Sequence, residues 1–155
     1  MSFMLALPNI SLHGQGAIED MVAMLATKQH GKALIVTDGQ LIELGLLDSL
    51  FSALKQAGLP YAIYGGVVPN PTSAHVDEGF RLYQENQCDY LIAFGGGSPI
   101  DTAKGIKILT ANPGPATMYS GVGKVTKPGV FLVAINTTAG TAAELTSNAV
   151  IIDSQ

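Results

Sequence analysis

Three consecutive glycines and the residues after them form the strongest candidate ligand-binding motif of the sequence. Gly95-Gly96-Gly97-Ser98-Pro99-Ile100-Asp101 directly follows the apolar run Tyr90–Phe94. Without a Cβ, glycine lets the backbone turn tightly and approach a ligand closely. We expect Ser98 to cap the next helix, with Pro99 at its first position and Asp101 at its third. The N–H groups and the positive helix end would then converge on the loop and favour a phosphate.

A turn without a ligand could have the same glycine content, so the motif alone leaves both interpretations open. No Gly-Lys-Ser/Thr follows it, which argues against a P-loop nucleotidase.

The second motif is a run of small polar residues after the apolar stretch Phe131–Ile135. It reads Asn136-Thr137-Thr138-Ala139-Gly140-Thr141-Ala142-Ala143-Glu144. Its hydroxyl and amide groups can donate to or accept from a ribose, a phosphate or a carboxamide. Thr141 and Glu144 also have the spacing of a capping box, which would give them a structural role instead.

Two further polar positions come directly after apolar runs. Asp38 directly follows the stretch Ala33–Thr37, and a carboxylate at the end of a sheet strand commonly accepts a hydrogen bond from a ribose 2′-hydroxyl. It could equally cap a turn at Gly39. Asn70 lies between Pro69 and Pro71, which stiffen its loop, although the same residues also make an ordinary turn.

Other residues that could take part in binding or catalysis are better explained by structural roles. Gly14-Gln15-Gly16-Ala17-Ile18-Glu19 half-matches a dinucleotide fingerprint, but Glu19 would repel a pyrophosphate, so we interpret it as a turn. The histidines are scattered, and His75 is expected on the solvated face of a helix. No pair has metal-ligand spacing, so the sequence predicts no complete metal site.

Apolar runs of strand length alternate with helical stretches. The expected strands are Ile10–Leu12, Ala33–Thr37, Tyr61–Tyr64, Tyr90–Phe94, Phe131–Ile135 and Ala149–Ile152. The expected helices are Ala17–Lys28, Leu46–Ala57, Ala74–Glu85 and Pro99–Ala111. This alternation predicts a doubly wound, mostly parallel α/β sheet, in which ligands bind at the carboxyl ends of the strands.

Composition narrows the functional classes. The formal net charge is −4 and no cluster of Lys and Arg occurs, which argues against nucleic-acid binding. The single cysteine, Cys88, excludes an internal disulfide, suits the cytoplasm and is expected to pack or end a helix. The apolar start, Met1–Leu7, is too short for a membrane span. Charged residues make up only 13%, typical of a sheet covered on both faces or of a surface that lies against another domain or subunit.

Taken in series, these motifs resemble the iron-containing (group III) alcohol dehydrogenases, in order and over essentially the whole chain. The quoted residues are Asp38, Pro69-Asn70-Pro71-Thr72, Gly95-Gly96-Gly97-Ser98-Pro99-x-Asp101 and Thr137-Thr138-Ala139-Gly140-Thr141-x-x-Glu144. Within the family, Tyr64–Pro71 and Thr141–Glu144 look most similar to the lactaldehyde reductase (propanediol oxidoreductase) type.

The resemblance implies a cofactor, NAD, and the residues that bind it. Asp38 matches the position facing the adenine ribose, which favours NAD over NADP, and Gly95–Ser98 matches the pyrophosphate loop. Asp101 matches the acid behind that loop. The remaining matched cofactor positions are Asn70, Thr137, Thr138, Thr141, Thr146 and Asn148.

The resemblance also implies what this chain lacks. Residues 1–155 would form one dinucleotide-binding domain, cut short before a helical domain that binds divalent iron or zinc through one Asp and three His. The whole protein would interconvert a small alcohol and its aldehyde as a cytoplasmic homodimer or larger homo-oligomer. A relative of glycerol dehydrogenase or dehydroquinate synthase, and a nucleotide-binding domain without catalysis, are the alternatives.

Overall fold

The computed structural model describes residues 10–121, 123–146 and 149–153. Its sheet has four parallel strands in the order β2-β1-β3-β4. They are β1 (Ala33–Val36), β2 (Tyr61–Tyr64), β3 (Tyr90–Gly95) and β4 (Phe131–Asn136). Every residue of β1 and β3 is buried, as expected for the central strands of a sheet covered on both faces.

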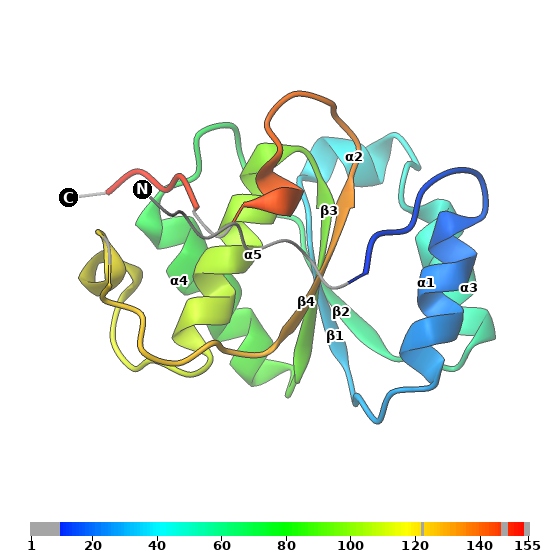
Figure 1. Cartoon of the computed structure of the whole chain (residues 1–155), viewed down its shortest axis with the longest axis horizontal. Helices are drawn as coiled ribbons and strands as arrows, with labels where there is room; N and C mark the ends of the chain where they lie inside the picture. The colour runs from blue at the N-terminus through cyan, green and yellow to red at the C-terminus, as the bar shows by residue number, and fades with distance from the viewer. Residues whose placement is uncertain (1–9, 122, 147–148, 154–155) are drawn as a thin grey trace, which may run out of the picture.

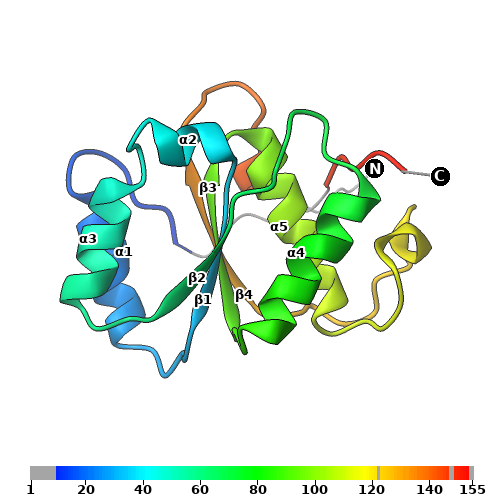
Figure 2. The same cartoon turned by 180° about the vertical axis from the view of Figure 1, so that it is seen from behind.

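Helices connect the strands and cover both faces of the sheet (Figures 1 and 2). The α-helices are α1 (Ala17–Ala26), α2 (Gly39–Glu43), α3 (Asp48–Gln56), α4 (Ser73–Glu85) and α5 (Gly97–Leu109). Two short 3-10 helices, η1 (Ala116–Tyr119) and η2 (Ala143–Leu145), lie in the loops before and after β4. The predicted doubly wound α/β fold is therefore confirmed.

One apolar core lies on each face of the sheet, because neighbouring residues of a strand point to opposite faces. Leu34 of β1 packs in the core beneath α4 and α5. Ile35, its neighbour, packs in the core beneath α1 and α3. Cys88 is buried in the first core, so its predicted packing role is confirmed.

Small residues allow α4 and α5 to approach closely. A Cβ on Gly79 of α4 would lie 2.5 Å from the Ile106 side chain, and a Cβ on Gly105 of α5 would lie 2.8 Å from Val76. A larger residue at either position would force a neighbouring side chain to shift, so glycine favours the close approach of the two helices. This packing fixes α5, whose first residues carry the glycine motif.

Two predicted strands are wrong. Ile10–Leu12 is exposed and in no strand. The segment 149–152 forms a single bridge, between Ile152 and Thr72, although Ile152 N–H also donates to Pro71 O at 2.9 Å. The apolar composition of both segments favoured a strand, but a strand also requires continuous backbone hydrogen bonding with a neighbouring strand.

The structure also contains a helix that the sequence did not suggest. α2 has only five residues and none of them is buried, so it shows no apolar stripe. Among the described residues, no helix combines the length and apolar character needed to cross a membrane.

Candidate nucleotide-binding site

A cleft of about 230 Å³ opens where the chain order of the sheet reverses. From β1 the chain moves outward to β2, and then crosses over to β3 on the other side of β1. The loops after β1 and β3 consequently diverge, which leaves a crevice at their carboxyl ends. The lining residues are Asp38, Leu41, Val67, Val68, Pro69, Gly96, Gly97, Ser98, Pro99, Thr137 and Thr138. Six residues predicted to bind the cofactor therefore lie around one cleft.

Close packing between the glycine loop and the loop after β4 forms one side of this cleft. Thr137 N–H donates to Gly95 O at 3.0 Å, which continues the pairing of β3 with β4. A Cβ on Gly96 would lie 2.7 Å from Thr138 Oγ1. The Gly96 backbone therefore lies against the threonine hydroxyl, and a larger residue would have to displace it.

Gly95 has a different role from its neighbours. It is buried, it lines neither cleft of this site, and its φ of 140° is one that other residues rarely adopt. A Cβ there would lie 2.7 Å from Pro99 Cγ and 3.1 Å from Leu41 Cδ1. Gly95 shapes the turn rather than facing the cleft.

The helix after the loop starts earlier than predicted. α5 begins at Gly97 with Gly96 as its N-cap, so the expected capping role of Ser98 is wrong. Ser98 instead lies in the first turn and lines the cleft. The first N–H groups of a helix have no partner within it, and Gly97 and Ser98 supply two such groups here. A helix that begins at Gly97 therefore presents free N–H groups to an anion, just as the predicted helix start would have done.

Asp38 lies opposite the glycine loop and caps α2. Its Oδ1 accepts a hydrogen bond from Leu41 N–H at 2.9 Å, so the capping alternative is confirmed. The residue is half-buried and also lines the cleft, so a carboxylate oxygen is still available to a ligand. Capping and ligand binding are compatible at this position.

A second cleft, of about 420 Å³, adjoins the first and shares Gly97 and Ser98 with it. The other lining residues are Asn70, Pro71, Asp101, Thr141, Ala143, Thr146, Val150 and Ile152. The predicted site residues are thus divided between two clefts that meet at the start of α5. Asn148 lies outside the described residues.

Two non-glycine residues at this second cleft have left-handed backbones. Asn70 has φ 57° and Ala142, beside the lining residue Ala143, has φ 51°. This conformation costs about 1–2 kcal/mol for an L-residue, and asparagine tolerates it best. Asn70 lines the cleft between two prolines, which supports the prediction that its side chain faces a ligand.

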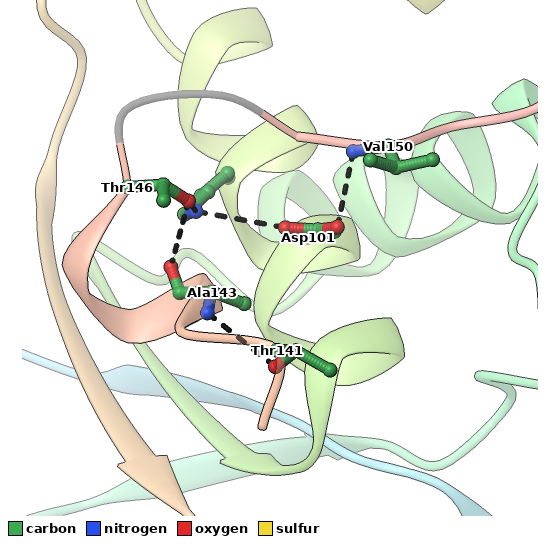
Figure 3. A network of polar contacts seen from close by, with 6 residues as sticks. Asp101, Thr141, Ala143, Thr146 and Val150 are labelled. Carbon is green, nitrogen blue, oxygen red and sulfur yellow. Dashed lines mark hydrogen bonds and ion pairs between the residues drawn. The ribbon is translucent and has the colours of Figure 1, made fainter. Parts of the chain in front are cut away.

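Asp101 connects α5 to the chain after η2 (Figure 3). Its Oδ2 accepts a hydrogen bond from Val150 N–H at 3.0 Å, and its Oδ1 lies 3.5 Å from Lys104 Nζ. Lys104 Nζ donates to Thr146 Oγ1 at 3.1 Å. Burial lowers the pKa of Lys104, while the charges of Asp101 and Glu144 act to raise it.

The capping-box alternative for Thr141 and Glu144 is wrong. Thr141 Oγ1 accepts from Ala143 N–H at 3.4 Å, and η2 begins after Ala142. Among the described residues, buried Glu144 Oε2 has no hydrogen-bond partner. Sequence reasoning missed Lys104, although its spacing of three from Asp101 on a helix was a usable signal.

The remaining candidates lie elsewhere. His75 is half-buried and has a capping role that was not predicted: its Nδ1 accepts from Thr72 N–H at 3.1 Å and completes a capping box for α4. Gly14–Gly16 is a turn that begins α1, as predicted, and neither cleft includes it. Within the described ranges, no three His, Cys, Asp or Glu residues gather into a possible metal site.

Comparison with known proteins shows the family to which this chain belongs. Residues 8–155 match the sequence profile of iron-containing alcohol dehydrogenases. The chain is 46% identical to lactaldehyde reductase of Escherichia coli strain K12 over 144 residues, which are 92% of this chain and 38% of that protein. It is 43% identical to the NAD-dependent methanol dehydrogenase of Bacillus methanolicus over 148 residues, 96% of this chain and 39% of that protein.

A crystal structure of 1,3-propanediol oxidoreductase superposes with a TM-score of 0.94 and 37% identity, over 99% of this chain and 40% of that one. The chain thus spans about two fifths of the length of these relatives. The match of all but the first seven residues shows that the chain belongs to the iron-containing alcohol dehydrogenase family.

Proposed function

We propose that this chain is the NAD-binding part of an oxidoreductase that transfers hydride between a nicotinamide and a small primary alcohol, diol or aldehyde. One observation carries the proposal: two clefts meet at the first turn of α5, which supplies Gly97 and Ser98 to both. A dinucleotide has two halves joined by a diphosphate, and a helix start is a suitable place for that diphosphate.

In this arrangement the adenosine half occupies the first cleft. Val67 and Val68 offer apolar contacts to a base, and Asp38 lies where a ribose would be held. A carboxylate accepts hydrogen bonds from a ribose hydroxyl but repels a 2′-phosphate. This supports selectivity for NAD over NADP.

The nicotinamide half is directed into the second cleft. Asn70, Thr141 and Thr146 place amide and hydroxyl groups on its walls. Such groups can bind a ribose or a carboxamide but supply no strong acid or base. Asp101 also lines this cleft, but its carboxylate is held by Val150 N–H and Lys104, so we assign no catalytic residue among the described ones.

The family name implies a divalent iron ion, with zinc as an alternative. The residues that the structure describes contain no cluster able to hold one, so they do not fit a metal centre. Hydride transfer is the chemistry of the nicotinamide, and the role of this chain is to bind and orient it.

Calorimetric titration with NAD and NADP tests the proposal. We expect weak but saturable binding of NAD, weaker binding of NADP, and no alcohol oxidation by this chain alone. Absence of binding for both dinucleotides would refute the proposed cofactor role. Turnover of an alcohol by the purified chain would contradict its restriction to cofactor binding.

We also propose a cytoplasmic homodimer or larger homo-oligomer for the whole protein. The family and the low fraction of charged residues, 13%, support this. Light scattering after size-exclusion chromatography measures the mass directly, and a monomer at micromolar concentration would contradict it.

A further inference from the structure

One face of α5 carries three functional positions on successive turns. Gly97, Asp101 and Lys104 are separated by four and three residues, so they lie along the same side of the helix. The described parts of the segment 141–152, residues 141–146 and 149–152, lie along this side and line the second cleft. The orientation of that wall therefore depends on what joins it to α5.

Two polar contacts make the connection (Figure 3). Val150 N–H donates to Asp101 Oδ2 at 3.0 Å, near one end of the segment. Lys104 Nζ donates to Thr146 Oγ1 at 3.1 Å, nearer its middle. The ion pair between Asp101 and Lys104, at 3.5 Å, links the two contacts.

Charge and burial make the lysine the central member of this group. The side chains of Asp101 and Lys104 are each only 13% exposed. Burial lowers the pKa of Lys104, and the charges of Asp101 and Glu144 oppose that shift. An uncharged residue at position 104 would leave both carboxylates without this cation and would remove the contact to Thr146, so that, of the two polar contacts, only the bond from Val150 to Asp101 would still hold the segment to α5.

Lys104 itself lines neither cleft, whereas Asp101, Thr141 and Thr146 all line the second one. We infer that Lys104 is a positioning residue: through its contacts with Thr146 and Asp101 it holds the described residues of this segment against α5, and so orients the wall that receives the nicotinamide half of the dinucleotide. This inference rests on the proposed function. It predicts a defect confined to the second cleft.

The test compares four variants of this chain by amide NMR titration with two probes, NAD and AMP. AMP contains only the half assigned to the first cleft. Lys104→Met and Lys104→Gln remove the charge, and Lys104→Arg restores it. Lys107→Met is the matched control, because Lys107 is on the same helix and its side chain has no hydrogen bond or ion pair with any described residue.

We expect Lys104→Met and Lys104→Gln to weaken NAD binding roughly tenfold, because misplacing a binding wall by an ångström has effects of this size or more. AMP affinity should stay within about twofold, since the first cleft is separate from the change. Lys104→Arg and Lys107→Met should bind NAD like the parent chain.

Equal weakening of NAD and AMP would show a general structural defect and overturn the inference, as would unchanged NAD affinity in both uncharged variants. Failure of Lys104→Arg to restore binding would also overturn it. If the parent chain binds neither probe, the proposed function fails instead, so the two failures are distinguishable. If Lys104→Met does not fold, the NAD and AMP affinities of Lys104→Gln test the inference in the same way.

Discussion

Gly14–Gly16 and Gly95–Gly97 are both glycine-containing turns that lead into helices, and only the second belongs to a cleft. Gly14–Gly16 begins α1, and a Cβ on either glycine would meet nothing within 4 Å. Gly95–Gly97 begins α5 and packs against Thr138, Thr141 and Pro99. Both turns present the start of a helix, so glycine and a helix dipole do not by themselves make a site.

Topology accounts for the difference. The turn before α5 follows β3, a central strand whose neighbours β1 and β4 end at the same edge and deliver Asp38 and Thr137 beside it. No described strand precedes the turn before α1, and His13 beside it is exposed. A ligand needs groups on several sides, and only the switch point of the sheet provides them.

The largest difference between the turns should appear in stability. Gly95→Ala is expected to lower the free energy of unfolding by about 3 kcal/mol, because it adds a strained φ to a clash with Pro99. Gly14→Ala, also at positive φ but in open space, should cost only about 1 kcal/mol. Urea unfolding measures both, and equal losses would contradict the packing described for Gly95.

The two turns should also differ in how much a substitution weakens NAD binding. Gly96→Ala should weaken NAD binding about tenfold, or 1.4 kcal/mol, because its Cβ displaces the Thr138 hydroxyl from the cleft. Gly16→Ala is the control, at a glycine with no neighbour to displace. Calorimetric titration measures both affinities; a similar loss in the two variants would remove the distinction between the turns.

The preference for NAD over NADP tests the role of Asp38, which lies opposite the glycine loop. Asp38→Lys should reduce the preference for NAD over NADP by about fivefold or more, because a cation replaces the carboxylate facing the ribose. Asp38→Asn keeps a side-chain oxygen for Leu41 N–H and so controls for the cap. Unchanged discrimination in the lysine variant would remove Asp38 from the ribose role.

High pH should destabilise the fold through Tyr83 of α4, a residue that belongs to neither turn. Burial raises the pKa of Tyr83 from 10.0 to about 12. The fold therefore favours the protonated phenol, and this stabilisation is complete below pH 10 and lost as the pH rises from 10 to 12. Tyr83→Phe should make the fall in unfolding free energy over this range smaller by about 1 kcal/mol. Urea unfolding at several pH values tests this, and an identical slope would contradict it.

Sequence periodicity predicted the sheet and four of the helices because buried strands and amphipathic helices have local patterns. Contacts between distant parts of the chain were not predictable in this way. The bond from Val150 to Asp101 spans 49 residues, so no local pattern could show that Val150 lies against α5.

The site residues were predicted better than their roles. The glycine motif indicated an anion site, but helix-capping preferences predicted that α5 begins at Pro99 with Ser98 as its cap, whereas it begins at Gly97. Asp38 was left between two roles, and the structure shows it capping α2 while lining a cleft. α2 was missed because five exposed residues have no periodicity.

Residue-resolved NMR of the chain during titration with NAD tests the central claim most directly. The claim predicts that the amide signals of Gly96, Gly97, Ser98 and Thr138 shift and saturate together, while those of Gly14 and Gly16 stay unchanged. Saturable shifts at the turn before α1, with none after β3, would contradict it.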